Sequence, residues 1–338
     1  MIDNFWKNKW VLVTGYEGFL GSHLTETLLN RGAKIIGLDK TYNRPNPILS
    51  NIRKDINYKK GNVINLKLVK DIIDKYKPQI IFHLAAETIV SAALRNPLNT
   101  FKSNIQGTWN LLDSCRGKNF VEAIVVASSD KAYGKHNTLP YKENYALMGE
   151  YPYDVSKSCT DLLSRSYFRT YGLPVCTTRC GNIYGPGDFH FSRIIPDVLR
   201  SIIKEKPLLI RSDGKFIRDY IYVKDIVGGY LLLAEKMPQA KLYGEAFNFS
   251  GENPISVLEL VKKIYQLAGT KPNYKILNKV KYEIKYQYLS SKKARKILGW
   301  KAKYTLEEGL RKTINWYKTH LLLQMICRPK LNDEKYHG

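Results

Sequence analysis

Hydrophobic residues recur along the chain in two patterns, as short continuous runs and as longer stretches with apolar positions every three or four residues. The short runs are rich in β-branched residues and predict strands, whereas the longer stretches predict amphipathic helices. The predicted strands are Trp10–Thr14, Ile35–Leu38, Ile80–Leu84, Ala123–Ala127 and Val175–Arg179, and the predicted helices are Phe19–Leu29, Leu66–Tyr76, Thr100–Cys115 and Tyr153–Tyr171. This alternation predicts an α/β fold with a doubly wound parallel sheet.

The later part of the chain alternates less regularly. Its predicted elements are Ile194–Ile203, Leu208–Ile210, Val223–Ala234, Ala246–Phe249, Val257–Ala268 and Thr305–His320. We interpret residues 1–185 and 223–251 as the domain that carries the sheet. Residues 186–222 and 252–326 are interpreted as a second, smaller mixed α/β domain, and 327–338 as a polar tail.

Composition excludes some classes of protein. The chain has 338 residues, 44% hydrophobic and 25% charged, which are globular values and exclude a largely disordered chain. No apolar run approaches the roughly 18–20 residues that cross a bilayer. The first residues do not resemble a secretory signal. Five cysteines, an odd number, at irregular spacings fit a reducing cytosol. Cys176 and Cys180 share one face of a predicted strand, which indicates core packing, and we expect no metal site.

The net charge is unusual. Lys and Arg number 54 and Asp and Glu 30, a balance of +24. Such a surface attracts polyanions, including nucleic acid and phosphorylated substrates. The basic residues are spread along the chain, which favours a solvated lysine-rich surface over a dedicated nucleic-acid site. An RNA-binding protein is nevertheless the alternative from another class.

Three glycines follow the first predicted strand and open the first predicted helix. They lie in the run Gly15-Tyr16-Glu17-Gly18-Phe19-Leu20-Gly21. Glycine permits a tight turn that lets backbone amides approach a pyrophosphate, and the helix N-terminus adds a positive dipole. Asp39 ends the second strand, where a carboxylate can bind the adenosine ribose and repel a 2′-phosphate. The sequence therefore predicts a Rossmann domain that binds NAD, although Lys40 and Arg44 stand beside Asp39.

A tyrosine and a lysine lie one helical turn apart at Tyr153 and Lys157. A phenol with a reference pKa of ~10 is a poor base at neutral pH, and a nearby cation lowers that pKa. Tyr220/Lys224 and Tyr288/Lys292 have the same spacing, but Tyr153 opens a helix after the strand that ends near Ser129. We therefore expect Tyr153 to take a proton from a substrate hydroxyl while Ser129 hydrogen-bonds that hydroxyl.

Several motifs resemble the extended branch of the short-chain dehydrogenase/reductase superfamily. They are the glycine run, His83-Leu84-Ala85-Ala86, Asn104-Ile105-Gln106-Gly107-Thr108, Arg179-Cys180-Gly181-Asn182-Ile183-Tyr184-Gly185-Pro186 and Arg218-Asp219-Tyr220-Ile221-Tyr222-Val223-Lys224-Asp225. The resemblance implies an NAD site that includes Asn62, Val63, Leu84, Ala85, Ala86, Asn104, Tyr153 and Lys157. Asn62 departs from the acidic residue usual near adenine. The resemblance also implies a homodimer through the helices Thr100–Cys115 and Tyr153–Tyr171.

The pair Asp130-Lys131 resembles the CDP-glucose type of nucleotide-sugar 4,6-dehydratase, where the dTDP-glucose type carries Asp-Glu. The resemblance implies that Asp130 protonates the departing C6 hydroxyl. Lys131 is then the C5 base or stabilises the enolate, and lysine acts as a base only in its neutral form. Gly187-Asp188-Phe189 and Ser192-Arg193-Ile194-Ile195-Pro196-Asp197 also resemble the CDP-glucose type.

The substrate end of the predicted site is less specific. Arg218-Asp219-Tyr220-Ile221-Tyr222 stands where the CDP-glucose type carries Arg-Pro-Trp-Gln-His. Arg193 and Arg218 are predicted diphosphate ligands because guanidinium binds phosphate in a bidentate manner. Asn182 is predicted to contact the nucleotide sugar. The nearest alternative function is a nucleotide-sugar 4-epimerase on the same fold.

Overall fold

A seven-stranded parallel sheet forms the centre of the molecule in the computed structural model, which describes residues 5–280 and 283–327. Its strands, in spatial order, are β11 (Ala246–Phe249), β6 (Val175–Cys180), β5 (Ala123–Ala127), β4 (Ile80–His83), β1 (Trp10–Thr14), β2 (Lys34–Asp39) and β3 (Ile56–Lys60). All neighbouring pairs are parallel, which confirms the predicted fold class.

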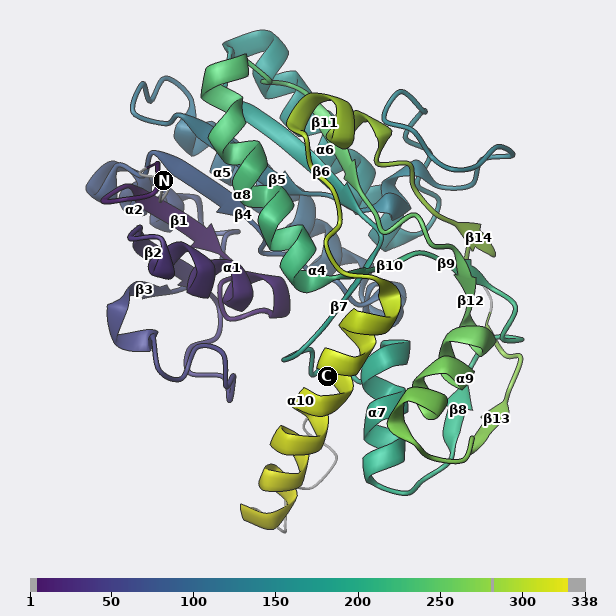
Figure 1. Cartoon of the computed structure of the whole chain (residues 1–338). Helices are drawn as coiled ribbons and strands as arrows, with labels where there is room; N and C mark the ends of the chain where they lie inside the picture. Colours follow the sequence, from purple (N-terminus) through teal and green to yellow (C-terminus); the bar gives the residue numbers. More distant parts are fainter. Residues whose placement is uncertain (1–4, 281–282, 328–338) are drawn as a thin grey trace.

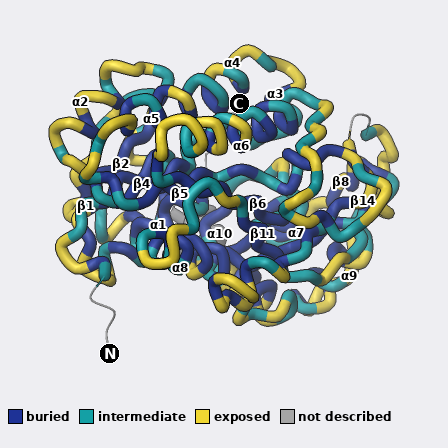
Figure 2. The backbone as a smooth tube through the Cα atoms, turned by 90° about the horizontal axis from the view of Figure 1, so that it is seen from above, coloured by how far each residue is buried: buried dark blue, intermediate teal, exposed yellow. Residues whose placement is uncertain are grey.

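Helices cover both faces of this sheet (Figure 1). α1 (Phe19–Asn30) and α8 (Val223–Ala240) pack together on one face, and α2 (Leu66–Tyr76), α5 (Gly107–Cys115) and α6 (Pro152–Tyr171) pack on the other. The central strands are the most deeply buried part of the chain (Figure 2). Cys176 and Cys180 are buried in the core on β6, as their spacing predicts.

Local sequence explains where α6 begins and ends. Pro152 occupies its first turn, where the missing N–H costs nothing, and Gly172 follows it in the left-handed conformation. The start of α6 therefore places Tyr153 and Lys157 at one fixed end of a 20-residue helix.

The predicted helix Thr100–Cys115 is more complex than expected. It begins earlier, as α3 (Val90–Arg95) and α4 (Pro97–Phe101), and passes through a π-helical turn, η2 (Lys102–Gln106), before α5. Two short 3₁₀ turns, η1 (Arg53–Asp55) and η3 (Asp130–Tyr133), complete the sheet-bearing part.

A second group of elements lies beyond the carboxyl ends of the sheet strands. It contains α7 (Ile194–Ile203), α9 (Val257–Ala268) and α10 (Leu306–Cys327), with a π-helical turn, η4 (Ala294–Leu298), on the side of α8. Its small sheets pair β7 (Asn182–Tyr184) with β10 (Tyr220–Tyr222), β8 (Leu208–Ile210) with β13 (Tyr274–Ile276), and β9 (Ile217–Arg218) with β12 (Ile255–Ser256) and β14 (Tyr286–Gln287). A separate apolar core joins α7, α9 and α10. The two-domain division stays a proposal, and the predicted tail lies outside the described residues apart from Cys327.

Candidate active site

One cavity of about 880 Å³ runs along the carboxyl edge of the sheet and into the second group of elements. This cavity is lined by every predicted site residue except Asn104. The lining residues are Gly15, Gly18, Phe19, Leu20, Gly21, Asp39, Asn62, Val63, Leu84, Ala85, Ala86, Ser129, Asp130, Lys131, Tyr153, Lys157, Asn182, Arg193 and Arg218. The strand order changes direction between β1 and β4, which is where doubly wound sheets bind their ligands.

The glycine turn fits a dinucleotide because backbone occupies the space that side chains would need. Gly15 has φ +75°, and a Cβ on it would lie 2.8 Å from the backbone nitrogen of Ala85. A Cβ on Gly21 would lie 2.2 Å from the carbonyl oxygen of Gly15. Only glycine permits this close approach of β1, α1 and the loop after β4, which leaves the start of α1 facing the cavity.

Backbone amides orient the Asp39 carboxylate. The amide of Glu17 donates to its Oδ2 at 3.2 Å, and the amide of Thr41 donates to its Oδ1 at 3.0 Å. Arg44 Nη2 lies 4.0 Å from Oδ1. Burial raises the pKa of Asp39, and these amides and Arg44 oppose the rise. The arrangement fits the ribose-binding role predicted for Asp39.

The acid turn, defined as Ser129 and η3, holds the predicted Asp-Lys pair. Ser129 caps the turn, since its Oγ accepts from the amide of Lys131 at 3.2 Å and donates to Asp130 Oδ1 at 3.0 Å. Asp130 is 5% exposed, and burial raises the pKa of its carboxyl while the charge of Lys131 opposes the rise. Lys131 Nζ donates to Gln287 Oε1 at 3.3 Å. Asp130 thus lies in an environment that favours the protonated acid.

Tyr153 and Lys157 lie on the same side of α6, and both are buried. Lys157 Nζ donates to the carbonyl of Ala127 at 2.7 Å and lies 6.0 Å from the centre of the Tyr153 ring. Burial lowers the pKa of Lys157 to about 8. Burial also raises the pKa of Tyr153, and a hydrogen bond with the side chain of Ser129 opposes this rise. Burial is therefore the largest influence on the pKa of Tyr153, and activation of the phenol by Lys157 stays a prediction.

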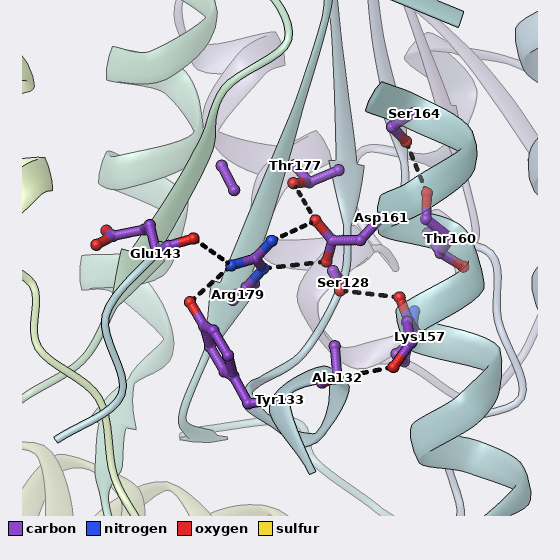
Figure 3. A network of polar contacts seen from close by, with 12 residues as sticks. Ser128, Ala132, Tyr133, Glu143, Lys157, Thr160, Asp161, Ser164, Thr177 and Arg179 are labelled. Carbon is purple, nitrogen blue, oxygen red and sulfur yellow. Dashed lines mark hydrogen bonds and ion pairs between the residues drawn. The ribbon is translucent and has the colours of Figure 1, made fainter. Parts of the chain in front are cut away.

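A buried polar network ties the acid turn to α6 behind the cavity (Figure 3). Arg179 on β6 donates to both carboxylate oxygens of Asp161, at 3.1 and 2.9 Å. Its Nη1 donates to the hydroxyl of Tyr133 in η3 at 2.7 Å and to the carbonyl of Glu143 at 3.2 Å. Thr177 also donates to Asp161, at 2.7 Å. The network therefore joins η3, through β6, to the middle of α6.

Both predicted phosphate-binding arginines are paired with carboxylates. Arg193 donates to Asp188 at 2.9 Å and to Thr88 at 3.3 Å. Arg218 donates to Glu283 at 2.6 Å and to two backbone carbonyls. A diphosphate must therefore share or displace these carboxylates. Asn182 lies nearby and donates to the carbonyl of Asp219 at 3.3 Å.

Asn104 is the predicted site residue that does not line the cavity. It lies in the π-helical turn η2, where its side chain accepts from the amide of Glu87 at 2.7 Å and donates to the carbonyl of Glu87 at 3.0 Å and to Ser156 Oγ at 2.9 Å. Its hydrogen bonds therefore connect the loop after β4 to α6. The sequence analysis missed Gln287 and Glu283 because they come from an irregular segment far along the chain.

Within the part of the chain that the structure describes, no group of three or more His, Cys, Asp or Glu residues could hold a metal ion. None of the described helices combines the length and apolar character needed to cross a membrane.

Comparisons with known proteins place the chain among nucleotide-sugar enzymes. The family model described as GDP-mannose 4,6 dehydratase matches residues 12–313. The CDP-glucose 4,6-dehydratase of Salmonella typhimurium is 29% identical over 94% of this chain and 93% of its own length. The UDP-glucuronate 4-epimerase of Thermodesulfobacterium geofontis is 33% identical over 92% and 97%. The dTDP-glucose 4,6-dehydratase of Streptomyces venezuelae, solved with NAD bound, has a TM-score of 0.86 at 26% identity over 93% and 98%.

Proposed function

The chain belongs to the family described as GDP-mannose 4,6 dehydratase, within the extended short-chain dehydrogenase/reductases, and we propose that it dehydrates a nucleotide-diphospho-hexose. The product is the 4-keto-6-deoxy sugar, and CDP-glucose is the substrate we expect first. Relatives at this identity include both dehydratases and a 4-epimerase, so the residues at the reacting end of the cavity must decide between the two reactions.

The observation that carries the proposal is the placement of Asp130 and Lys131 in the cavity beside Tyr153. A 4,6-dehydration must expel a hydroxide from C6 and remove a proton from C5. The first step calls for a general acid near C6 and the second for a base near C5. A 4-epimerase moves hydride away from C4 and back; it needs a base for the C4 hydroxyl but no acid at C6 and no base at C5. A buried acid with a raised pKa therefore favours dehydration.

The chain's residues divide the chemistry between them. Tyr153 accepts the proton of the C4 hydroxyl, with Ser129 beside it. Asp130 protonates the C6 hydroxyl as it leaves as water. Lys131, held by Gln287, removes and returns the C5 proton or stabilises the enolate. Arg193, Arg218 and Asn182 hold the nucleotide-diphosphate portion.

The cofactor that fits the glycine turn and Asp39 is NAD, which neighbouring structures contain. When bound, NAD would supply a hydride acceptor for C4 and a hydride donor for C6, so that no net oxidation would occur. Gly15, Gly18, Gly21 and Asp39 would hold its pyrophosphate and ribose, and Lys157 its nicotinamide ribose.

A substrate panel tests the proposal. The protein is incubated with CDP-, UDP-, GDP- and dTDP-hexoses, and the products are examined by mass spectrometry and by the alkali-induced absorbance of a 4-keto sugar. Loss of 18 mass units together with that absorbance supports dehydration. An Asp130→Asn control should bind the same sugar but form roughly 10²–10⁴-fold less product. A C4 epimer of unchanged mass would instead establish the epimerase.

We further propose that the protein is a homodimer through α4, α5 and α6. These helices expose large apolar side chains at Leu98, Trp109 and Leu162, which are 69%, 43% and 54% exposed. Such side chains in contact with water on adjacent helices are typical of an interface. Leu162→Lys should convert the dimer to a monomer in light scattering. Ile276→Lys, at a position on β13 that is 45% exposed, should leave the mass unchanged.

A further inference from the structure

The basic cavity is a second cavity, of about 840 Å³, lined mainly by the loop 142–147, the second half of α6 and a segment around η4. Arg179 and Asp161 of the network in Figure 3 form part of its wall. Among the residues that the structure describes, none lines both this cavity and the first one. The basic cavity is therefore a separate place for a ligand.

Positive charge dominates the basic cavity. Its described lining residues include seven Lys and Arg but three Asp and Glu, a balance of +4. The first cavity, which is proposed to hold two phosphate-bearing molecules, has seven and six of these residues, a balance of +1. A concave site lined by one sign of charge focuses the electric field and raises the local concentration of the opposite ion. By charge alone, the basic cavity therefore favours anions more than the first cavity does.

Most of the cations in the basic cavity have no carboxylate partner. Lys293 pairs with Glu245 at 2.6 Å, and Arg179 pairs with Asp161 at 2.9 Å. The remaining five form no ion pair with a carboxylate of the described residues, and they are Lys142, Arg165, Arg169, Lys292 and Lys296. In the first cavity, four of the seven cations are paired with carboxylates. The basic cavity thus leaves its positive charge available to a ligand.

Four of these cations form two pairs at a spacing where like charges repel. Arg165 and Arg169 lie four residues apart on α6, and Lys292 and Lys296 lie four residues apart in the helical segment that contains η4. Like charges at this spacing destabilise a helix. All four side chains line the basic cavity, so an anion bound there would offset both repulsions.

We propose that the basic cavity binds a linear oligophosphate, either free or as the phosphate chain of a nucleotide. Arginine binds phosphate oxygens in a bidentate manner, which suits Arg165 and Arg169, and lysine acts as a point charge. The volume of about 840 Å³ lies within the usual range of small-molecule sites, which favours a small anion over an RNA strand. This site goes beyond the proposed dehydration and does not depend on it.

Titration calorimetry of the full chain with sodium triphosphate tests the site. It is carried out at about 0.1 M ionic strength, where exposed charges more than roughly 10 Å apart are largely screened from each other. Three double variants each lose two exposed cations: from the basic cavity, from the first cavity, and from α2 and α9 away from both cavities. They are Arg165→Gln with Lys296→Gln, Arg193→Gln with Arg211→Gln, and Lys67→Gln with Lys262→Gln.

The parent should bind triphosphate in a site that the basic-cavity variant weakens by at least about tenfold, since hydrogen bonds between charged groups are the strong ones. The variant on α2 and α9 should change this affinity by less than about threefold, because its charges are screened. The first-cavity variant should leave the same site unchanged. Light scattering should give one mass for all four proteins, so that a lost affinity does not come from altered assembly.

The same titrations with CTP identify the form of the oligophosphate. If the basic-cavity variant weakens both ligands, the phosphate chain is the recognised group, and if it weakens CTP alone, the occupant is a nucleotide. Absence of binding by either ligand would overturn the proposal. So would a loss confined to the first-cavity variant, or an equal loss in the variant on α2 and α9. A single-stranded RNA that binds the basic cavity more tightly than both ligands would also overturn it.

Discussion

Replacing Arg179 with methionine removes the cation at the centre of the buried network in Figure 3. Arg179 and Asp161 are 5% and 4% exposed, and two hydrogen bonds of 3.1 and 2.9 Å join them. Methionine fills similar space without charge, which leaves the Asp161 carboxylate in the interior with only the Thr177 hydroxyl as a strong partner. Breaking a buried ion pair on one side costs about 3–5 kcal/mol.

This loss converts to a measurable change in melting temperature. An unfolding entropy of about 2.1 cal/mol/K per residue gives roughly 0.7 kcal/mol/K for 338 residues. We therefore expect Arg179→Met to lower Tm by about 4–7 °C in scanning calorimetry. Arg311→Met is the matched control, because Arg311 pairs with Glu307 on the surface with its side chain 58% exposed. Surface pairs contribute about 0–1 kcal/mol, so Tm should fall by no more than about 1.5 °C.

A second substitution distinguishes the loss of stability caused by the unpaired charge from the loss caused by poorer packing. Asp161→Asn in the Arg179→Met background removes the stranded charge, so Tm should rise again by more than half of the loss. The reasoning fails if Arg179→Met lowers Tm no more than Arg311→Met does. It also fails if the second substitution does not raise Tm again, because the loss of stability would then come from packing and not from the unpaired charge.

Three further predictions concern single side chains of the site. Burial raises the pKa of Asp154 from 3.8 to about 6, so its carboxyl contributes stability below pH 4 that is lost as pH rises through 6. In urea unfolding at pH 8, Asp154→Asn should therefore be roughly 1–3 kcal/mol more stable than the parent protein. This difference in stability should vanish by pH 4. Asp39→Ala should weaken NAD binding by about 1.5–3 kcal/mol in calorimetric titration and reduce the preference for NAD over NADP, and unchanged affinity would remove Asp39 from the ribose site. Gln287→Leu removes the acceptor of Lys131 and should lower kcat at least about tenfold while KM changes little, whereas an equal rise in KM would point to substrate binding instead.

Periodicity predicts the sheet because its strands are buried on both sides. β1, β4 and β5 are continuous apolar runs in the sequence and have almost no exposed residues in the structure. The edge strand β3 was not predicted, since its sequence Ile-Asn-Tyr-Lys-Lys has one buried position and polar residues facing water. Lysine on an edge strand discourages pairing with other chains, and the same feature hides the strand from pattern analysis.

Site residues that belong to one contiguous motif could be predicted from the sequence, whereas residues that reach the site from distant segments could not. The glycine turn and the acid turn are each contiguous in sequence, so both could be proposed as parts of the site before the fold was known. Gln287 reaches Lys131 across 156 positions of the chain, and no local pattern indicates such a contact. Asn104 was predicted to belong to the cofactor site from its motif, and in the structure it hydrogen-bonds the loop after β4 from a π-helical turn, so its role toward the cofactor stays a prediction.

Burial has opposite consequences for the two halves of the reacting site. For Asp130 it raises the pKa of the carboxyl, a direction that suits the general acid proposed for it. For Tyr153 it also raises the pKa of the phenol, a direction that opposes the base proposed for it. A positive charge beside a phenol favours the phenolate. The proposed proton abstraction by Tyr153 would therefore be helped by an oxidised nicotinamide held at this edge of the sheet, whereas the proposed acid would need no such help.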